Sequence, residues 1–144
     1  MAANAIPIFS KTPNIDGSNI SGGGYMTAAN TTADLTAGTI YLSFTAGSNG
    51  AFVNFIRYRP TPAGNTTATV ARVWLNNGSA TGTATNNILF DEISLPATTA
   101  SGTGATNGFS LPMNIALKNG WRIYHTIHTA SANGWAATVV GGDY

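Results

Sequence analysis

Charged residues are scarce in this chain. Of its 144 residues, 6 are Lys or Arg and 5 are Asp or Glu, which together make 8%, whereas ordinary soluble domains contain about 25%. The formal net charge is only +1. The sequence therefore lacks the basic footprint of a nucleic-acid-binding protein, and copies of the chain repel one another weakly. We expect a protein that functions inside an assembly and has no nucleic-acid partner.

Cysteine and long apolar runs are also missing. The absence of cysteine excludes disulfides and metal sites built from thiolates. The N-terminal residues contain neither a basic segment nor a continuous apolar segment, so we expect no secretory signal. No apolar run approaches the roughly 18 residues of a membrane-spanning helix. We therefore predict no membrane partner.

Strand patterns dominate what is present, and helical patterns are nearly missing. Apolar residues alternate with polar ones between turn residues such as Asn-Gly, which is typical of antiparallel strands. This pattern predicts an all-β antiparallel β-sandwich, jelly-roll-like, of about eight strands; an immunoglobulin-like order is the alternative, although its Cys–Trp–Cys pattern is absent. The predicted strands cover residues 39–45, 52–58, 69–76, 88–95, 109–117, 121–129 and 135–140, with weaker candidates at 6–9 and 24–27.

The alternation also predicts which side chains share a face. Period two places Ile40, Leu42 and Phe44 together in the first of these strands, and Leu89 together with Ile93 in the fourth. The fifth strand, 109–117, contains a proline at position 112. Since proline cannot donate a ladder hydrogen bond, we expect this strand to lie at a sheet edge or to carry a bulge.

The first 37 residues differ from the rest of the chain. They are rich in Asn, Gly and Thr, and we predict an extended N-terminal arm over residues 1–37 on a sandwich domain of residues 38–144. Leaving a large apolar side chain in water costs about 1.5–3 kcal/mol. We therefore take Ile6, Ile8 and Phe9 as candidate contact residues, together with Ile15, buried on the same chain or on a neighbour. A flexible terminus is the alternative.

Three arginines form the second set of candidate contact residues. Arg57 and Arg59 are two positions apart in one predicted strand and share a face, and we place Arg72 across from them. Such a group suits an acidic patch of a partner protein, or a phosphate. The alternative is a solvated sheet edge, where charge prevents pairing with other strands.

No pattern in the sequence predicts catalysis. His125 and His128 are three positions apart in a predicted strand and point to opposite faces, so they cannot ligate one metal ion together. Asp91 and Glu92 are adjacent and also diverge, unlike the paired acids of glycosidases. We predict no catalytic residues, no metal site and no cofactor, and we do not expect an enzyme.

Four segments of the second half carry a resemblance to a known family. These are RVWLNNG at 72–78, NILFDEISLPA at 87–97, LKNGWRIY at 117–124 and GWAATVVGGDY at 134–144. Over roughly residues 39–144 the chain resembles capsid decoration (cement) proteins of tailed bacteriophages. The resemblance implies a jelly-roll virion protein, made in the host cytoplasm, that forms a homotrimer on the capsid exterior and clamps the major capsid protein. It implies no catalytic residues.

A carbohydrate-binding or receptor-binding module of a phage tail or surface protein is the alternative function. Its candidate residues are Trp74, Trp121 and Trp135, which would line a platform for sugar rings. Against this, tryptophans of a β-sandwich are more often part of its core or of an interface. The position of the three indole rings decides between these two interpretations.

Overall fold

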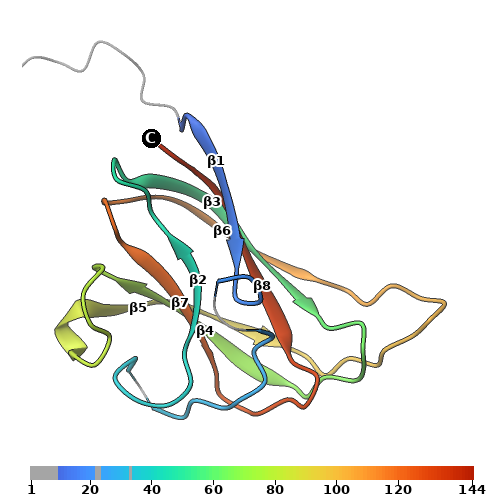
Figure 1. The fold of residues 1–144 in the computed structure, drawn as a ribbon. Helices are drawn as coiled ribbons and strands as arrows, with labels where there is room; N and C mark the ends of the chain where they lie inside the picture. Colours follow the sequence, from blue (N-terminus) through green and yellow to red (C-terminus); the bar gives the residue numbers. More distant parts are fainter. Residues whose placement is uncertain (1–9, 22–23, 33) are drawn as a thin grey trace, which may run out of the picture.

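The computed structural model of the chain describes residues 10–21, 24–32 and 34–144, and these residues form two packed sheets (Figure 1). They contain eight strands and one short 3-10 helix, so the predicted all-β sandwich is confirmed. No helix in these ranges is long and apolar enough to cross a membrane. The elements are β1 (Thr12–Gly17), β2 (Tyr41–Thr45), β3 (Ala51–Pro60), β4 (Thr69–Asn76), η1 (Ala84–Asn86), β5 (Asn87–Leu95), β6 (Phe109–Leu117), β7 (Arg122–Ile127) and β8 (Trp135–Asp143).

The strand order is that of a jelly roll. The first sheet has the order β1-β8-β3-β6 and the second has the order β2-β7-β4-β5. The pairs are nested along the chain, because β1 pairs with β8, β2 with β7, β3 with β6 and β4 with β5, all antiparallel. Such nesting wraps one long folded hairpin into two facing sheets. The jelly-roll prediction is therefore confirmed.

The main core lies between the two sheets and follows the period of two. In β3, Ile56 and Tyr58 point into the core while Arg57 and Arg59 are exposed, as predicted. Each large side chain buried in this way contributes about 1.5–3 kcal/mol. The largest fully buried side chains of this core are Trp135, Tyr58, Phe44, Met26, Ile56, Leu95, Ile123 and Ile127.

Two β-bulges overturn the predicted faces of β2 and β5. In β2 the register shifts between Leu42 and Phe44, so Phe44 enters the main core while Leu42 packs on the outer side of the second sheet. In β5 a shift of the same kind places Leu89 opposite Trp74 and Ile93 on the core side. A bulge adds one residue to a strand and so exchanges the two faces beyond it.

The proline in β6 has both predicted consequences. β6 is the edge strand of the first sheet. Its register with β3 shifts between Val53 and Phe55, opposite a stretch in which Asn114 has a φ of 49°. The bulge lets Pro112 sit in the strand without breaking the ladder on its paired side.

The N-terminal region contributes a strand that was not predicted. Thr12–Gly17 lies within the predicted arm, is extended, and pairs with β8 as an edge strand of the first sheet. Its sequence, TPNIDG, has a single apolar side chain suited to a strand, which is why alternation does not reveal it. The weaker candidate at 24–27 is reduced to an isolated bridge between Met26 and Trp135, and the one at 6–9 lies outside the described residues.

Candidate functional site

The outer face of the second sheet is covered by the chain itself. Leu35 and Trp74 are 1% and 3% exposed and form a second apolar cluster with Tyr124. Ile40, just before β2, and Leu42, the second residue of β2, pack against this cluster. The Trp74 indole donates a hydrogen bond to Thr126 Oγ1 at 3.1 Å. This part of the face, over β4 and β7, therefore stabilises the fold and offers little area to another molecule, whereas Leu89 on β5 is 45% exposed.

Asn30 holds that covering segment in place. Its side-chain amide donates to the carbonyl oxygens of Ala37 at 2.9 Å and Thr39 at 3.0 Å. Its Oδ1 accepts the backbone N–H of Thr32 at 3.0 Å, and its own N–H donates to the carbonyl of Ile127 in β7. A buried amide that makes these bonds links both ends of the covering loop to the sheet.

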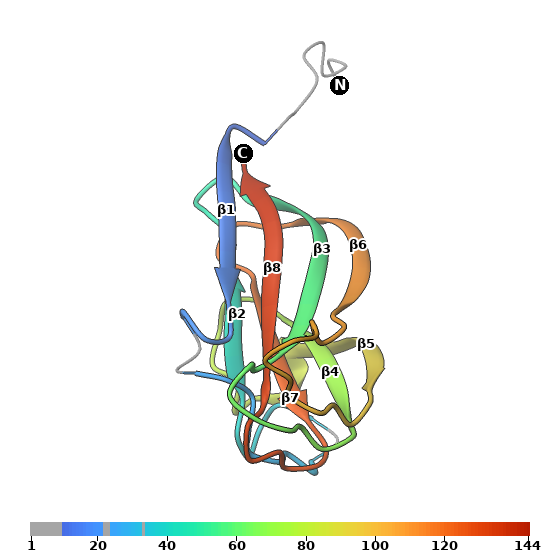
Figure 2. The same ribbon diagram turned by 90° about the vertical axis from the view of Figure 1, so that its right-hand side faces the viewer.

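The outer face of the first sheet carries an uncovered apolar stripe. One cross-strand row runs over all four strands, through Ile15 in β1, Val140 in β8, Phe55 in β3 and Pro112 in β6. Ile15 is 62% exposed, Pro112 is exposed, and the other two side chains are partly exposed. Figure 2 faces this sheet and shows no described segment lying over its upper half. We call these four residues the stripe.

Two exposed arginines continue the same face below the stripe. Arg57 lies in the next outward-facing row, opposite Thr138 and Ser110, and Arg59 lies one row further along β3. Neither forms an ion pair within residues 10–21, 24–32 and 34–144, where the salt bridge found joins Arg72 to Glu92. β3 has a neighbour on each side, so the alternative that these arginines protect a sheet edge is wrong.

Arg72 is not brought together with Arg57 and Arg59. It lies on β4 in the other sheet and points outward, so its predicted place across from them is wrong. Its Nε lies 2.7 Å from Glu92 Oε1 in β5, and its guanidinium donates to the Asn30 carbonyl at 3.4 Å. Arg72 thus attaches the covering loop to the second sheet.

Of the remaining candidate contact residues, the structure describes one and leaves three outside the described residues. Ile6, Ile8 and Phe9 lie outside the described residues, so their predicted contact stays a prediction. Ile15, from the same predicted arm, is part of the stripe. Ile20 and Tyr25, which follow β1 in the predicted arm, are also exposed and lie outside the stripe.

The three tryptophans do not form a sugar platform. Trp74 belongs to the covered cluster, and Trp135 is 0% exposed in the main core. Trp121 packs against the main core at its margin, with Lys118 Nζ 5.8 Å from the ring centroid. The three rings lie in different parts of the sandwich, so the platform predicted for the alternative function is wrong.

The two histidines are separated by the end of β7, which stops at Ile127, so His125 lies in the strand and His128 beyond it. His125 is fully buried, its Nδ1 lies 2.8 Å from Ser43 Oγ, and its ring packs edge-on against Tyr58. Burial lowers the pKa of His125 to about 3, which keeps the ring neutral, and raises the pKa of Tyr58. His128 is exposed. Although Ser43 and His125 have the types of a nucleophile and its base, both are fully buried, so substrate has no access to them.

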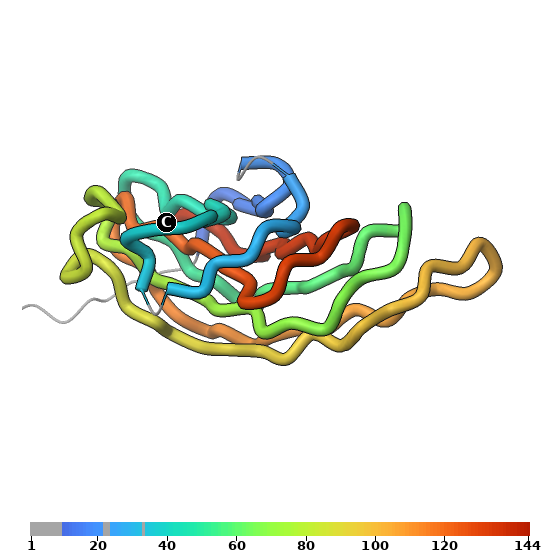
Figure 3. Tube along the Cα trace, turned by 90° about the horizontal axis from the view of Figure 1, so that it is seen from below, coloured from blue at the N-terminus to red at the C-terminus, as the bar shows by residue number. Residues whose placement is uncertain are grey.

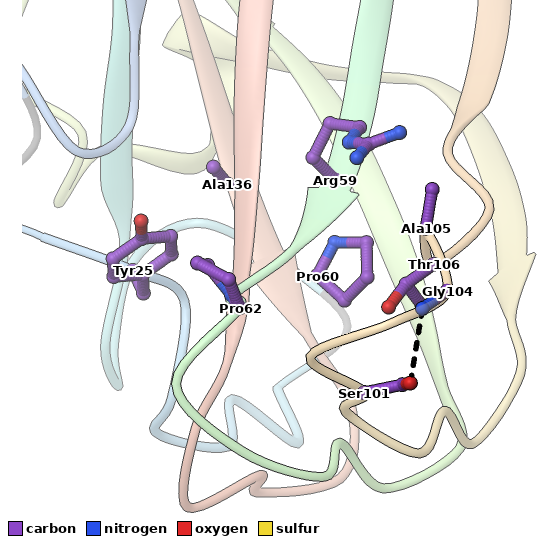
Figure 4. Close-up of a pocket in the computed structure, with 9 residues that line it drawn as sticks. All are labelled: Tyr25, Arg59, Pro60, Pro62, Ser101, Gly104, Ala105, Thr106 and Ala136. Atoms are coloured by element: carbon purple, nitrogen blue, oxygen red, sulfur yellow. Dashed lines mark hydrogen bonds between the residues drawn. The ribbon is translucent and has the colours of Figure 1, made fainter.

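Among the hollows on the described surface, two are of interest. One, of about 290 Å³, lies between the end of β3 and the loop of residues 96–108 and is lined by Arg59, Tyr25 and two prolines (Figure 4). That loop projects beyond the rest of the chain in Figure 3. The other is an open groove of about 530 Å³ with His128 on its wall and mainly apolar surroundings. Across the described ranges, no three potential metal ligands come together.

A third exposed surface lies on the free edge of β5. This strand is the last of the second sheet and pairs only with β4. Ile88, Leu89 and Phe90 are consecutive in it and all exposed. Free strand edges with apolar side chains attract further chains. The sequence alone did not reveal this surface, because alternation predicts that such residues are half-buried.

Comparison with known proteins adds no relative to this description. No family model matches the chain, and neither a curated protein nor a solved structure matches it. The function is therefore argued from the surfaces described above.

Proposed function

We propose that this protein is a structural virion protein, a capsid decoration (cement) subunit that binds the outside of a phage head and stabilises contacts between major capsid proteins. The observation that carries the proposal is the uncovered stripe with Arg57 beside it. It supports a docking face, because within the described residues the chain covers part of the outer face of the second sheet and leaves the stripe exposed. The resemblance in segments 72–144 points to the same function.

The chemistry of the docking face specifies its partner. Apolar side chains cross four hydrogen-bonded strands, so they are held in a fixed arrangement before binding. The stripe and the adjoining row with Arg57 contain no Asp or Glu. The complementary surface of the major capsid protein therefore has an apolar patch beside acidic side chains. Repetition of this contact over a symmetric shell turns modest single affinities into strong attachment.

Copies of the chain would contact each other through β5. The free edge of β5 and the exposed Ile88, Leu89 and Phe90 supply main-chain hydrogen bonds and apolar area away from the stripe. The low net charge opposes this contact only weakly. We therefore propose that each copy in the homotrimer contacts a different surface of the next copy through this edge, with the stripe facing the shell.

Co-sedimentation with capsids tests the docking face. The probe is the purified chain mixed with heads assembled from the major capsid protein encoded in the same genome. We expect saturable binding at micromolar concentration, at least tenfold weaker for Arg57→Glu and nearly unchanged for Arg57→Lys. Lys118→Glu is the matched control, since it changes the net charge equally at an exposed position outside this face. Equal weakening by both reversals contradicts the docking face, and no binding of the wild type contradicts the function.

Light scattering after size-exclusion chromatography tests the β5 contact. A trimer has three times the 14.8 kDa mass of one chain, and Phe90→Ser should shift the population to monomers. Ile20→Ser is the control. Like Phe90, Ile20 is a large exposed apolar residue, but it lies outside β5. A wild-type protein that stays monomeric at high micromolar concentration refutes the trimer in solution and leaves capsid docking to its own assay.

A further inference from the structure

The hollow beside Arg59 has the composition of a small binding pocket. Its volume of about 290 Å³ is close to the lower end of the range for ligand sites, about 300–1,000 Å³. One wall is the end of β3 with Arg59, Pro60 and Pro62, and the other is the loop with Ser101 and Thr106 (Figure 4). None of the sequence patterns predicted this pocket, because the loop and β3 are about 40 residues apart in the chain.

Gly108, the last residue of the loop, leaves room for the Arg59 side chain at the pocket. A Cβ added to Gly108 would lie 2.5 Å from Arg59 Cδ and 2.9 Å from the carbonyl oxygen of Tyr58. The absence of a side chain at Gly108 therefore lets the aliphatic part of Arg59 lie across the strand. Arg59 forms no ion pair within the described part of the chain. In Figure 4 its guanidinium lies at the upper edge of the pocket, on the side of Ala105.

The loop presents hydroxyl groups on a fixed backbone. Ser101 Oγ accepts the N–H of Thr103 at 3.2 Å and that of Gly104 at 3.1 Å, which closes a tight turn at the loop tip. Ser101 Oγ also lies 3.3 Å from Thr103 Oγ1, where either hydroxyl can be the donor, and Thr106 adds a second hydroxyl to the same wall of the pocket. Together they offer donors and acceptors to a ligand that has several hydroxyl groups.

Apolar ring surfaces complete the pocket. Tyr25 is 38% exposed and lies next to Pro62 on the flank of the pocket, as Figure 4 shows. An aromatic face with a polar tip suits a ligand whose one side is C–H and whose other side is polar. A pyranose ring has this shape, and its hydroxyls match the opposite wall. An acidic peptide side chain would leave most of these hydroxyls without a partner.

We propose that this pocket binds a saccharide that carries a carboxylate. Arg59 pairs with the carboxylate through two parallel N–H···O bonds. The hydroxyls of Ser101 and Thr106 bond to sugar hydroxyls, and Tyr25 with the two prolines contacts the ring. A carboxylate fits better than a phosphate, since a single guanidinium lines the pocket and phosphate sites usually add backbone N–H groups or further cations. This binding is separate from capsid docking and does not depend on it.

Titration by NMR with defined oligosaccharides tests the proposal. The probes are a glucuronic-acid and a sialic-acid oligosaccharide, each beside its carboxamide derivative, and a sugar phosphate. We expect at least tenfold tighter binding of an acid than of its carboxamide, with chemical-shift changes at the loop of residues 96–108. Equal binding of acid and carboxamide, tighter binding of the sugar phosphate, or no binding of either acid overturns the proposal.

Two variants test whether binding of the acidic sugar depends on the pocket residues or only on the positive charge of this face. Arg59→Gln should weaken binding of the acidic sugar at least tenfold, and Tyr25→Ala should weaken it severalfold. Arg57→Gln is the matched control, because Arg57 is an exposed arginine of the same strand face outside the pocket. Equal loss in Arg57→Gln and Arg59→Gln contradicts a site at Arg59. Capsid co-sedimentation of Arg59→Gln, measured in parallel, distinguishes a failure of this proposal from a failure of the docking face.

Discussion

The outer faces of the two sheets differ in how far their apolar side chains are buried. On the second sheet, a loop folds back and buries Trp74 and Leu35 almost completely, with Asn30 as the clamp. On the first sheet, Ile15 remains 62% exposed at the end of a stripe that crosses every strand. Both faces carry apolar side chains, but among the residues that the structure describes a covering segment lies over the second sheet and none lies over the stripe.

The difference separates stability from binding. Side chains of the covered face lose their packing when they are truncated, so they contribute to the free energy of unfolding. Side chains of the stripe already contact water in the isolated chain, so they contribute little to folding and more to association. We therefore expect substitutions on the covered face to lower the free energy of unfolding, and substitutions in the stripe to weaken binding to capsids.

Truncation on the covered face should give the largest effect. Trp74→Ala removes a side chain that is 3% exposed and its hydrogen bond to Thr126, and we expect a loss of about 3–5 kcal/mol in the free energy of unfolding. Urea denaturation followed by circular dichroism measures it. Capsid binding per folded molecule should be unchanged. A loss below about 1 kcal/mol would show that the covering loop is not closed over the sheet in solution.

Acid should lower the free energy of unfolding, because His125 is buried between the two sheets. Burial lowers the pKa of His125 from 6.5 to about 3, so the unfolded chain takes up a proton in that range and the folded chain does not. Stability is therefore full above pH 6.5 and falls as the pH drops toward 3, by about 2 kcal/mol between pH 8 and pH 5. Urea midpoints measured across this range test the slope.

The two histidines supply a matched pair for that experiment. His125→Gln should flatten the slope between pH 8 and pH 5, whereas His128→Gln should keep it, because His128 is exposed. An unchanged slope in His125→Gln would assign the pH dependence to other groups.

Substitution of Asn30, which holds the covering loop, should have an intermediate effect on the free energy of unfolding. Asn30→Ala removes the amide that donates to the carbonyls of Ala37 and Thr39, and each lost hydrogen bond of this kind costs about 0.5–1.5 kcal/mol. Hydrogen exchange should accelerate first in the loop of residues 34–40 and only later in β4. If all of these amides exchange together, the loop is not a separate unit of stability.

The inner architecture could be predicted from the sequence, because it depends on alternation and turns. β4 and β6 have the predicted bounds, and the inward Ile56 and outward Arg57 follow from period two. The bulges could not be predicted: one extra residue leaves the apolar pattern intact while moving Leu42 and Leu89 to the outer side. β1 was missed because its polar side chains need β8 to form a strand.

The candidate surfaces were predictable only in part. Arg57 and Arg59 share a face, as the sequence indicated, but Arg72 lies on the other sheet, because a sequence does not specify which strands share a sheet. The stripe needs the cross-strand register of four strands distant in sequence. The Arg59 pocket needs the position of a loop that contains few apolar side chains. Both depend on tertiary contacts rather than on local pattern.

A substitution in the stripe should change the free energy of unfolding least. It tests most directly whether the two outer faces differ as described. Ile15→Thr keeps a β-branched residue in β1 and removes apolar area that is mostly in water already, so the free energy of unfolding should change by less than about 0.5 kcal/mol. The same variant should bind capsids severalfold more weakly, because its contribution is made only in the complex. Since Ile15 and Trp74 both lie on outer faces, a large stability loss in Ile15→Thr would mean that the first sheet is also covered in solution, and the docking face would then have to lie elsewhere.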